Sequence, residues 1–589
     1  MTELKIWAPS ATSVAIEIHG KREPMHPDAD GHWMLNSDDL THGTDYAVWL
    51  DDQGPFPDPR SAWQPAGVHG PSRWIDHGIF AWSDSNWHAK PFAEAILYEL
   101  HIGTFTPEGT FAAAISRLDE LVELGITHIE IMPVAEFIGT RGWGYDGVDL
   151  YAPHHSYGGP DGLKQLIDAC HARGVGVVLD VVYNHLGKEG NYVEKFGPYF
   201  HALFDTPWGK AVNLDGAQSE HVRRFFIDNA LMWLRDYHID GLRLDAVHTF
   251  VDQSHVHFMA QLVDEIKTLG FSLGRNFTLI AESDLNDPKV VKPATEGGWG
   301  FDAQGNEDFH HALHTLLTGE NFGYYRDFGN VNDLAKVLGE NFCIADRYSE
   351  HRQRLHGRSA AGIESHRFIA FAQNHDQTGN RATGERIGHL VDSGRVKLAA
   401  AVTLLSPFVP MLFQGEEWSA SSPFNYFADL LDPVVIDEMR QGRRAEFATS
   451  NHDPASIPDP LDEGTFRQSQ LNWEERSAKQ HHEILEWYKD LIRLRKDEPD
   501  FAPGPLDSEG VECDEATGTL SFRRGRYRVV CNFSAQSQQV LCSEQDVLEL
   551  VMASSSAVEL FDVGEVFMPM HSVAVLENVA EMYVSSQGG

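Results

Sequence analysis

The chain has 589 residues, long enough for several domains and a large hydrophobic core. It carries 46 Lys and Arg against 87 Asp and Glu, which gives a net charge of −41 at pH 7. A field of that sign repels phosphate backbones and anionic lipids, so nucleic acid and membrane surfaces are poor partners, whereas a neutral ligand such as a sugar is not excluded.

Nothing in the sequence predicts secretion or a membrane span. The start, MTELKIWAPS, lacks the basic and apolar regions of a signal peptide. The most apolar stretch, 399–413, contains Pro407 and Pro410 and falls short of the ~18 apolar residues that a span needs, so we interpret it as a buried helix followed by a buried strand. Five scattered cysteines without a CxxC pair favour free thiols. Together these features predict a cytoplasmic protein.

Residues 1–90 contain short alternating runs such as SVAIEIHG and DYAVWL, separated by Pro, Gly and Asp. Alternation of apolar and polar residues with a period of two is typical of half-buried strands. We therefore expect a small N-terminal β-sandwich.

Residues 91–499 alternate between apolar strands and amphipathic helices. The expected strands are ILYELHIGTF, ITHIEIMPV, VGVVLDVVYNH, DGLRLDAVH, FTLIAES, GFDAQ, FIAFAQNHD and PMLFQGE. The expected helices are FAAAISRLDELVELG, DGLKQLIDACHARG and residues 217–237, 255–269 and 394–405. Apolar strands that alternate with helices imply a parallel sheet covered by helices, and eight of them predict a closed (β/α)8 barrel.

The pattern changes again after the helix HHEILEWYKDLIRLRKDEPD. Residues 500–589 return to short alternating strands such as LSFRRGRYRVVCNF and HSVAVLE, which predict a C-terminal β-sandwich. The expected fold class is therefore α/β, with a TIM barrel flanked by an N-terminal and a C-terminal β-sandwich.

In such a barrel the residues that act on a ligand lie at the C-terminal ends of the strands. Several expected strands end in polar residues: Asp180, Asn184, His185, Arg243, Asp245, Glu282, Asn374, His375 and Asp376. The loops 134–160 and 186–216 follow strands at this end, and long loops in that place usually build a binding site.

Three of these residues, Asp245, Glu282 and Asp376, are carboxylates that only the fold can bring together. Carboxylates paired at one barrel mouth suit glycoside hydrolysis, in which one is the nucleophile and another the proton donor. Arg243 shares a strand face with Asp245, so we expect it to hold that carboxylate ionised with a lowered pKa. Glu282 follows the apolar TLIA, and apolar surroundings raise a carboxyl pKa as a general acid requires.

Each of these features has a plainer explanation when taken alone. A strand-end Asp is commonly a helix cap, and a buried Arg–Asp pair can be a purely structural ion pair. It is the joint pattern on successive strand ends that favours catalysis.

Four segments, DVVYNH, GLRLDAVH, IAES and AQNHDQTGNR, resemble the signature regions of the α-amylase superfamily, glycoside hydrolase family 13. The leading LKIWAPSA resembles the sandwich module that precedes the barrel in branching and debranching members. Three further segments resemble those of superfamily members that act on maltooligosyltrehalose: EDFHHALHTLLTGE, NHDQTGNR and LFQGEEW. A branching enzyme typically has SHDE in place of NHDQ.

The resemblance implies that Asp245 is the nucleophile, Glu282 the acid and base, and Asp376 the carboxylate that stabilises the transition state. His185 and His375 would bond hydroxyl groups of the sugar that is cleaved, and Tyr145 would stack on it. The full set of substrate-binding residues implied is Tyr145, His185, Arg243, His248, Asp308, His310, His311, His375, Gln377 and Asn380. Of these, His248, Gln377 and Asn380 would lie towards the leaving group. Asp308, His310 and His311 would line the trehalose side.

The implied reaction is a retaining cleavage of the α-1,4 bond next to the terminal trehalose of a maltooligosyltrehalose, a step of trehalose biosynthesis. No cofactor is expected. Asn184 matches an amylase calcium ligand, but no loop pattern supplies the other ligands, so no metal is expected either. Gly305 stands where the resemblance would place a Trp, which removes a stacking platform worth about 1 kcal/mol.

Two alternatives stay open. An α-glucan branching or debranching enzyme would share all three carboxylates. A non-catalytic amylase-like binding protein would keep the barrel but lose carboxylates, whereas all three are present here.

The charge balance predicts salt-dependent stability. Self-repulsion at a net charge of −41 is screened as the Debye length falls from about 30 Å at 0.01 M to about 8 Å at 0.15 M salt. We expect the melting temperature to rise over that range, measured by calorimetry at constant pH. A melting temperature that stays flat would contradict the argument.

Overall fold

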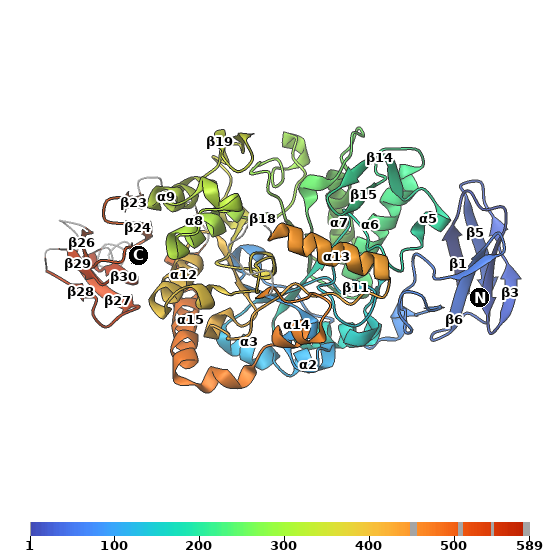
Figure 1. The fold of residues 1–589 in the computed structure, drawn as a ribbon, viewed down its shortest axis with the longest axis horizontal. Coiled ribbons are helices and arrows are strands. Elements are labelled where there is room, and N and C mark those ends of the chain that lie inside the picture. The colour runs from blue at the N-terminus through green and yellow to red at the C-terminus, as the bar shows by residue number, and fades with distance from the viewer. Residues whose placement is uncertain are drawn as a thin grey trace.

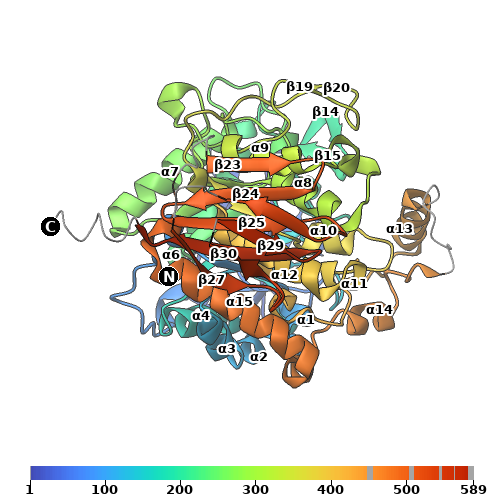
Figure 2. The same cartoon turned by 90° about the vertical axis from the view of Figure 1, so that its left-hand side faces the viewer.

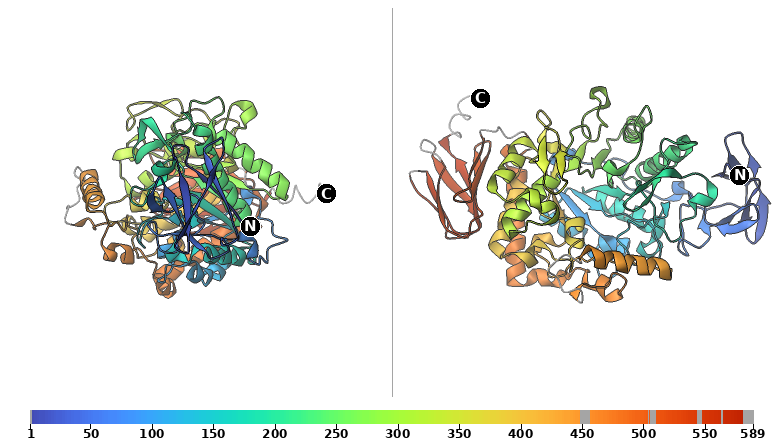
Figure 3. Two further views of the ribbon diagram at one scale, coloured as in Figure 1. Left: turned by 90° about the vertical axis from the view of Figure 1, so that its right-hand side faces the viewer. Right: turned by 45° about the horizontal axis from the view of Figure 1, so that its top comes forward.

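The structure is a computed structural model that describes residues 2–447, 456–502, 504, 510–542, 547–562 and 564–580. The sequence analysis assigns residues 581–589 to the C-terminal β-sandwich, and these lie outside the described residues. The molecule is elongated, with a central barrel between β-sheets of the N-terminal region at one end and of the C-terminal region at the other (Figures 1 and 3).

Two antiparallel sheets make up the N-terminal region. One contains β1 (Thr2–Trp7), β5 (His32–Ser37) and β4 (His26–Pro27); the other contains β3 (Lys21–Pro24), β2 (Val14–Ile18), β6 (Asp45–Leu50), β7 (Gln53–Phe56) and β8 (Ser72–Arg73). Along β2, Val14, Ile16 and Ile18 are buried while the residues between them are half-buried. This alternation confirms the predicted sandwich.

Eight parallel strands close into a barrel, as the sequence predicts. In chain order they are β9 (Leu97–Leu100), β10 (His128–Ile131), β13 (Gly176–Val181), β16 (Gly241–Leu244), β17 (Thr278–Ala281), β18 (Ala303–Gly305), β21 (Phe368–Ala370) and β22 (Val409–Phe413). The short β18 is the strand expected at GFDAQ. Both faces of these strands are covered, and every residue of β10, β13 and β16 is buried, the polar ones included.

An apolar cluster inside the barrel lies directly beneath the polar strand ends. Val178 and Ile280 belong to this cluster. Two residues further along the same strands stand Asp180 and Glu282, and residues i and i+2 of a strand face the same way. The interior side chains therefore change from apolar to acidic at the C-terminal end of the barrel.

The structure contains the expected helices and adds others. Their bounds are α2 (Phe111–Ile115), α3 (Leu118–Leu124), α4 (Gly159–His171), α6 (Ser219–Asp236), α7 (Phe258–Leu273), α8 (Glu307–Thr318), α9 (Val331–Glu340), α12 (Ser393–Leu405), α13 (Pro433–Glu446), α14 (Glu463–Gln468) and α15 (Lys479–Asp497). The helices α8, α9, α13 and α14 are among those that the sequence analysis did not assign.

One helix prediction is wrong in detail, because FAAAISRLDELVELG forms two helices rather than one. The hydroxyl of Ser116 donates to the carbonyl of Ala113 at 2.6 Å. A side chain that bonds the backbone in this way competes with helical bonding and favours a break. The helix α3 begins again at Leu118.

The apolar stretch 399–413 is buried, as predicted, within α12 and β22. Among the described residues, no helix is both long and apolar enough to cross a membrane. All five cysteines carry free thiols.

Two further antiparallel sheets form the C-terminal region. One contains β23 (Val511–Asp514), β24 (Thr519–Arg524), β25 (Tyr527–Asn532), β30 (Ser572–Asn578) and β27 (Leu548–Ala553); the other contains β26 (Gln538–Leu541), β29 (Glu565–Met568) and β28 (Glu559–Leu560). The five-stranded sheet contacts α9 and α12 of the barrel (Figure 2). This confirms the second predicted sandwich.

Candidate active site

The guanidinium of Arg243, on β16, binds three carboxylates at once. Its Nη1 donates to Oδ2 of Asp180 at 2.8 Å and to Oδ1 of Asp245 at 3.0 Å, and its Nη2 lies 3.2 Å from Oε2 of Glu282. These acids come from β13, β16 and β17, which are neighbours in the barrel. The side chain of Arg243 is only 8% exposed. A charge is stable at that depth because it is paired and hydrogen-bonded.

Both carboxylate oxygens of Asp245 are held in place. Oδ1 binds Arg243, and Oδ2 accepts a hydrogen bond from Nδ2 of Asn184 at 2.6 Å. Burial raises the pKa of Asp245, Arg243 opposes that rise, and the net direction is upward. The expectation of a lowered pKa is therefore wrong, because the desolvation of a buried carboxylate outweighs a cation that is shared among three acids.

Glu282 occupies the more open side of the arginine, with its side chain 24% exposed. The backbone NH of Ala246 donates to Oε2 of Glu282 at 2.8 Å. Ala246 adopts a left-handed backbone with φ 44° and ψ 48°, which is uncommon for a residue with a Cβ atom. Burial raises the pKa of Glu282 and the nearby Asp245 adds to the rise, which fits the expected general acid.

Asp376 and His375 begin α10 (His375–Gly379), which Asn374 caps by accepting from the backbone NH of Asp376. Oε2 of Glu99 accepts a hydrogen bond from the backbone NH of His375 at 2.9 Å, and Oε1 of Glu99 bonds Nδ1 of the same histidine. Burial lowers the pKa of His375, but Glu99 overcomes this effect and raises the value to about 9. Burial raises the pKa of Asp376.

Tyr145 links the two halves of the site. Its hydroxyl lies 2.8 Å from Nε2 of His375 and donates to Oδ2 of Asp180 at 2.6 Å. Its ring stacks on that of His375, with centroids 5.2 Å apart and planes 21° from parallel. A continuous hydrogen-bonded chain therefore runs from Glu99 through His375, Tyr145 and Asp180 to Arg243.

His185 is present at the site, but both of its ring nitrogens are used inside the protein. Nδ1 bonds the side chain of Asn184, and Nε2 bonds the backbone oxygen of Tyr145 at 3.0 Å. The ring stacks with Trp208, on the hairpin of β14 (Phe200–Thr206) and β15 (Gly209–Val212). In this conformation His185 has no free nitrogen for a sugar hydroxyl.

A cavity of about 540 Å³ opens beside His185. It lies between the hairpin that carries Trp208 and the helix α13, and the lining residues include Ile138, Asp146, Leu430, Val435 and Met439. Trp208 is 47% exposed. A half-exposed aromatic ring at the edge of a largely apolar cleft that also contains charged groups is suited to stack on a sugar ring.

The expected leaving-side residues surround Asp376 and Glu282. Asn380 donates from Nδ2 to Oδ1 of Asp376 at 2.9 Å, and Gln377 donates from Nε2 to Oε2 of Glu307 at 2.7 Å. His248 lies with Nε2 3.8 Å from Oδ1 of Asp284.

Two predicted binding residues of α8 have their polar atoms bonded inside the protein. Both oxygens of Asp308 are bonded, to Nδ2 of Asn286 at 3.0 Å and to the backbone NH of Ile344 at 2.7 Å. Both nitrogens of His310 are bonded as well, to Ala372 and Tyr325. Their assignment to the trehalose side stays a prediction.

His311 lies one helical turn after Glu307, on the same face of α8. Its Nε2 is 3.9 Å from Oε2 of Glu307, and its ring stacks on Tyr324 with centroids 4.7 Å apart. Residues four apart share a helix face, whereas neighbours along the helix do not. The sequence reasoning selected Asp308 and missed Glu307, although helical periodicity counted from His311 would have found it.

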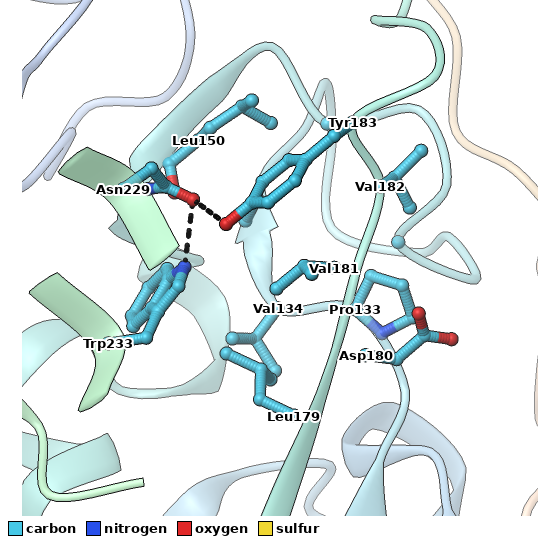
Figure 4. A pocket seen from close by; sticks show the side chains of 13 residues that line it. Pro133, Val134, Leu150, Leu179, Asp180, Val181, Val182, Tyr183, Asn229 and Trp233 are labelled. Atoms are coloured by element: carbon cyan, nitrogen blue, oxygen red, sulfur yellow. Dashed lines mark hydrogen bonds between the residues drawn. The ribbon is translucent and has the colours of Figure 1, made fainter. Parts of the chain in front are cut away.

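A polar cluster outside the barrel braces β13. Oδ1 of Asn229, on α6, accepts from the hydroxyl of Tyr183 at 2.6 Å and from Nε1 of Trp233 at 3.1 Å. Figure 4 shows these side chains converging behind the strand, while Asp180 points away from them. The cluster fixes the segment that carries Asp180 and Asn184.

One group of side chains among the described residues has donor atoms close enough together for a metal ion. It consists of Glu136, His154 and His155, whose donor atoms lie within 4.8 Å of one another. The oxygens of Glu136 already bond the backbone NH and Nδ1 of His155. None of the three candidate catalytic carboxylates belongs to the group.

The closed barrel and its arginine-held carboxylates define a glycoside hydrolase of the α-amylase type, and residues 79–202 match the model of the alpha amylase catalytic domain. The protein is 47% identical to malto-oligosyltrehalose trehalohydrolase of Arthrobacter ramosus over 89% of this chain and 91% of that one. It is 46% identical to the enzyme of the same name from Mycobacterium tuberculosis strain H37Rv over 93% and 95%. The chain belongs to the family of malto-oligosyltrehalose trehalohydrolases, within the α-amylase superfamily.

The solved structures agree on the fold. An α-amylase-like protein from Salmonella typhimurium matches with a TM-score of 0.89 at 36% identity, over 98% of this chain and 97% of that one. The pullulanase of Paenibacillus barengoltzii matches with a TM-score of 0.71 at 18% identity, over 98% of this chain and 92% of that one, and shares the fold alone.

The pair of Glu99 and His375 predicts a pH-dependent contribution to stability. The pKa of His375 is raised to about 9, so its charged form stabilises the folded state fully below pH 6.5, and this contribution is lost as the pH rises through about 9. We expect Glu99→Gln to lower the free energy of unfolding most below pH 6.5. Urea unfolding at several pH values would measure this, and a difference that grows between pH 6.5 and 9 would contradict the assignment.

Proposed function

We propose that this protein cleaves the α-1,4 bond next to the terminal trehalose of a maltooligosyltrehalose and releases free trehalose, as a step of trehalose biosynthesis. The observation that carries the proposal is the set of Asp245, Glu282 and Asp376 at one barrel mouth, with the first two on a single guanidinium. Identity above 40% over most of the chain to relatives named for this activity supports it.

The proposed reaction is a double displacement with retention. Glu282 protonates the bridging oxygen, and a carboxylate oxygen of Asp245 attacks the anomeric carbon to form a glycosyl–enzyme ester. Glu282, now ionised, takes a proton from water, which attacks the same carbon and frees Asp245. Asp376 stabilises the positive charge that develops on the sugar ring.

We further propose how the substrate lies. The cavity between Trp208 and α13 would take part of the glucan chain. Gln377, Asn380 and His311 would bind the leaving trehalose: Asn380 bonds Asp376, and Gln377 and His311 both lie at Glu307.

The remaining assignments are also proposals. Residues 1–90 and 500–589 would be accessory domains of a catalytic domain at 91–499. Free thiols at all five cysteines favour a reducing compartment, and we infer a cytoplasmic enzyme.

The nucleophile assignment predicts the effect of Asp245→Asn. The substitution is nearly isosteric, so the fold should persist while turnover of maltotriosyltrehalose falls by more than about a thousandfold. Asp161→Asn, on the exposed start of α4, is the matched control and should keep full turnover. If the purified Asp245→Asn protein kept a tenth of the activity, the loss would be only about 1.4 kcal/mol, too small for a covalent nucleophile.

The substrate assignment predicts the products. Trehalose joins two glucose units through both anomeric carbons, so a site with polar groups placed for it should reject plain maltooligosaccharides. We expect release of trehalose from maltotriosyltrehalose at least about tenfold faster than cleavage of maltopentaose, and no α-1,6 branches in amylose, as followed by chromatography and NMR. Equal rates would overturn the trehalose assignment, and new branch points would move the protein to the branching class.

A further inference from the structure

One carboxyl group beside the catalytic acid has no role in the proposed reaction. Glu307 is the first residue of α8 and follows β18 directly. Its side chain is only 18% exposed, and Oε2 accepts a hydrogen bond from Nε2 of Gln377 at 2.7 Å. Gln377 itself follows Asp376 along the chain, so Glu307 lies within the active site.

The surroundings of Glu307 favour its neutral form. Burial raises its pKa to about 8, and the nearby carboxylates of Glu282 and Asp376 contribute to the rise. A carboxylic acid can donate one hydrogen bond, which a carboxylate cannot. Because Oε2 already accepts from Gln377, the oxygen left to carry the proton is Oε1.

Oε1 of Glu307 has no hydrogen-bond partner among the described residues. A Cβ atom added at Gly305 would meet only Cε1 of Phe371 at 3.9 Å and this oxygen at 4.0 Å. The Cβ position of residue 305, where the family resemblance expects a tryptophan, therefore lies next to this oxygen.

An unpartnered acceptor lies close by. Oε1 of Gln377 is buried and has no hydrogen-bond partner in the part of the chain that the structure describes. A buried carbonyl oxygen without a partner is unfavourable, and a bound ligand hydroxyl that donates to it would remove that cost. The amide of Gln377 thus offers a free acceptor, and the carboxyl group of Glu307 offers a free donor. The two side chains are also hydrogen-bonded to each other.

We propose that Glu307 and Gln377 form a donor–acceptor pair that binds hydroxyl groups of the leaving trehalose and sets the preference for it over a linear glucan. The inference rests on the proposed function. Neighbouring hydroxyl groups of a sugar can accept one hydrogen bond and donate another, which is what this pair offers. The pair lies beside Glu282, which protonates the leaving oxygen, and His311 and Tyr324 close the site behind Glu307.

The first test measures selectivity. The ratio of kcat/KM for maltotriosyltrehalose to that for maltopentaose should fall about tenfold in Glu307→Ala and in Gln377→Ala, mainly through KM for the trehalose substrate. Glu340→Gln, on the exposed end of α9, is the control, and its ratio should match wild type. An unchanged ratio in both alanine variants would overturn the inference.

The second test separates a hydrogen-bond donor from a packing group. In wild type, KM for maltotriosyltrehalose should rise between pH 7 and 9 as Glu307 ionises and loses its donor proton, because its pKa is about 8. Glu307→Gln cannot ionise, so its KM should rise less than that of wild type over that range, in which His375, with a pKa of about 9, titrates in both proteins. The pH profile of kcat should keep its shape. The same pH dependence of KM in Glu307→Gln and wild type would overturn the inference.

Failure of the proposed function would look different. If wild-type protein releases no trehalose from maltotriosyltrehalose and calorimetry detects no binding of free trehalose, the function itself is wrong. If wild type does both, and Glu307→Ala binds free trehalose as tightly as wild type, only the assigned pair is wrong. Circular dichroism of each variant checks that it is folded.

Discussion

The site depends on a single guanidinium that three carboxylates share. Arg243 bonds Asp180 and Asp245 through one nitrogen and approaches Glu282 with another. Removing it would leave Asp180, Asp245 and Glu282 close together without the one cation that binds all three, and breaking buried ion pairs in this way is strongly destabilising. The parallel register of β13, β16 and β17 brings the strand ends to one edge, and the arginine fixes how the acids lie there.

The same arginine ends a longer chain of bonds. Asp180 accepts a hydrogen bond from the hydroxyl of Tyr145, and that hydroxyl also bonds Nε2 of His375. Glu99 bonds Nδ1, the other ring nitrogen of His375. The members come from β9, β13, β16, the loop before β12 (Asp149–Pro153) and the start of α10. Rings and acids that brace each other in this way keep catalytic groups in one geometry before substrate arrives, which is what electrostatic catalysis requires.

The sequence predicted those features of the structure that follow from the pattern of neighbouring residues along the chain. A period of two placed Arg243 and Asp245 on one face, and alternation of strands and helices predicted the whole barrel. It was less informative about α8, where the motif drew attention to Asp308 and His310, whose polar atoms are bonded inside the protein, and not to Glu307, which lies beside His311. The partnership of Glu99 with His375 joins residues 276 positions apart, and no local pattern reveals it. The pKa of Asp245 depends on burial, which the sequence does not measure.

The raised pKa values have a consequence for the chemistry. Five acids, Glu99, Asp180, Asp245, Glu282 and Asp376, share the two cations Arg243 and His375 in the part of the chain that the structure describes. This excess of negative charge is unfavourable in the empty enzyme, as the upward pKa shifts of Asp245, Glu282 and Asp376 indicate. The transition state of glycoside hydrolysis carries positive charge on the sugar ring, and the same excess stabilises it. The negative charge of these acids stabilises the neutral substrate little and the positively charged transition state much. The acids therefore bind the transition state more strongly than the substrate, which is what lowers the barrier of the reaction.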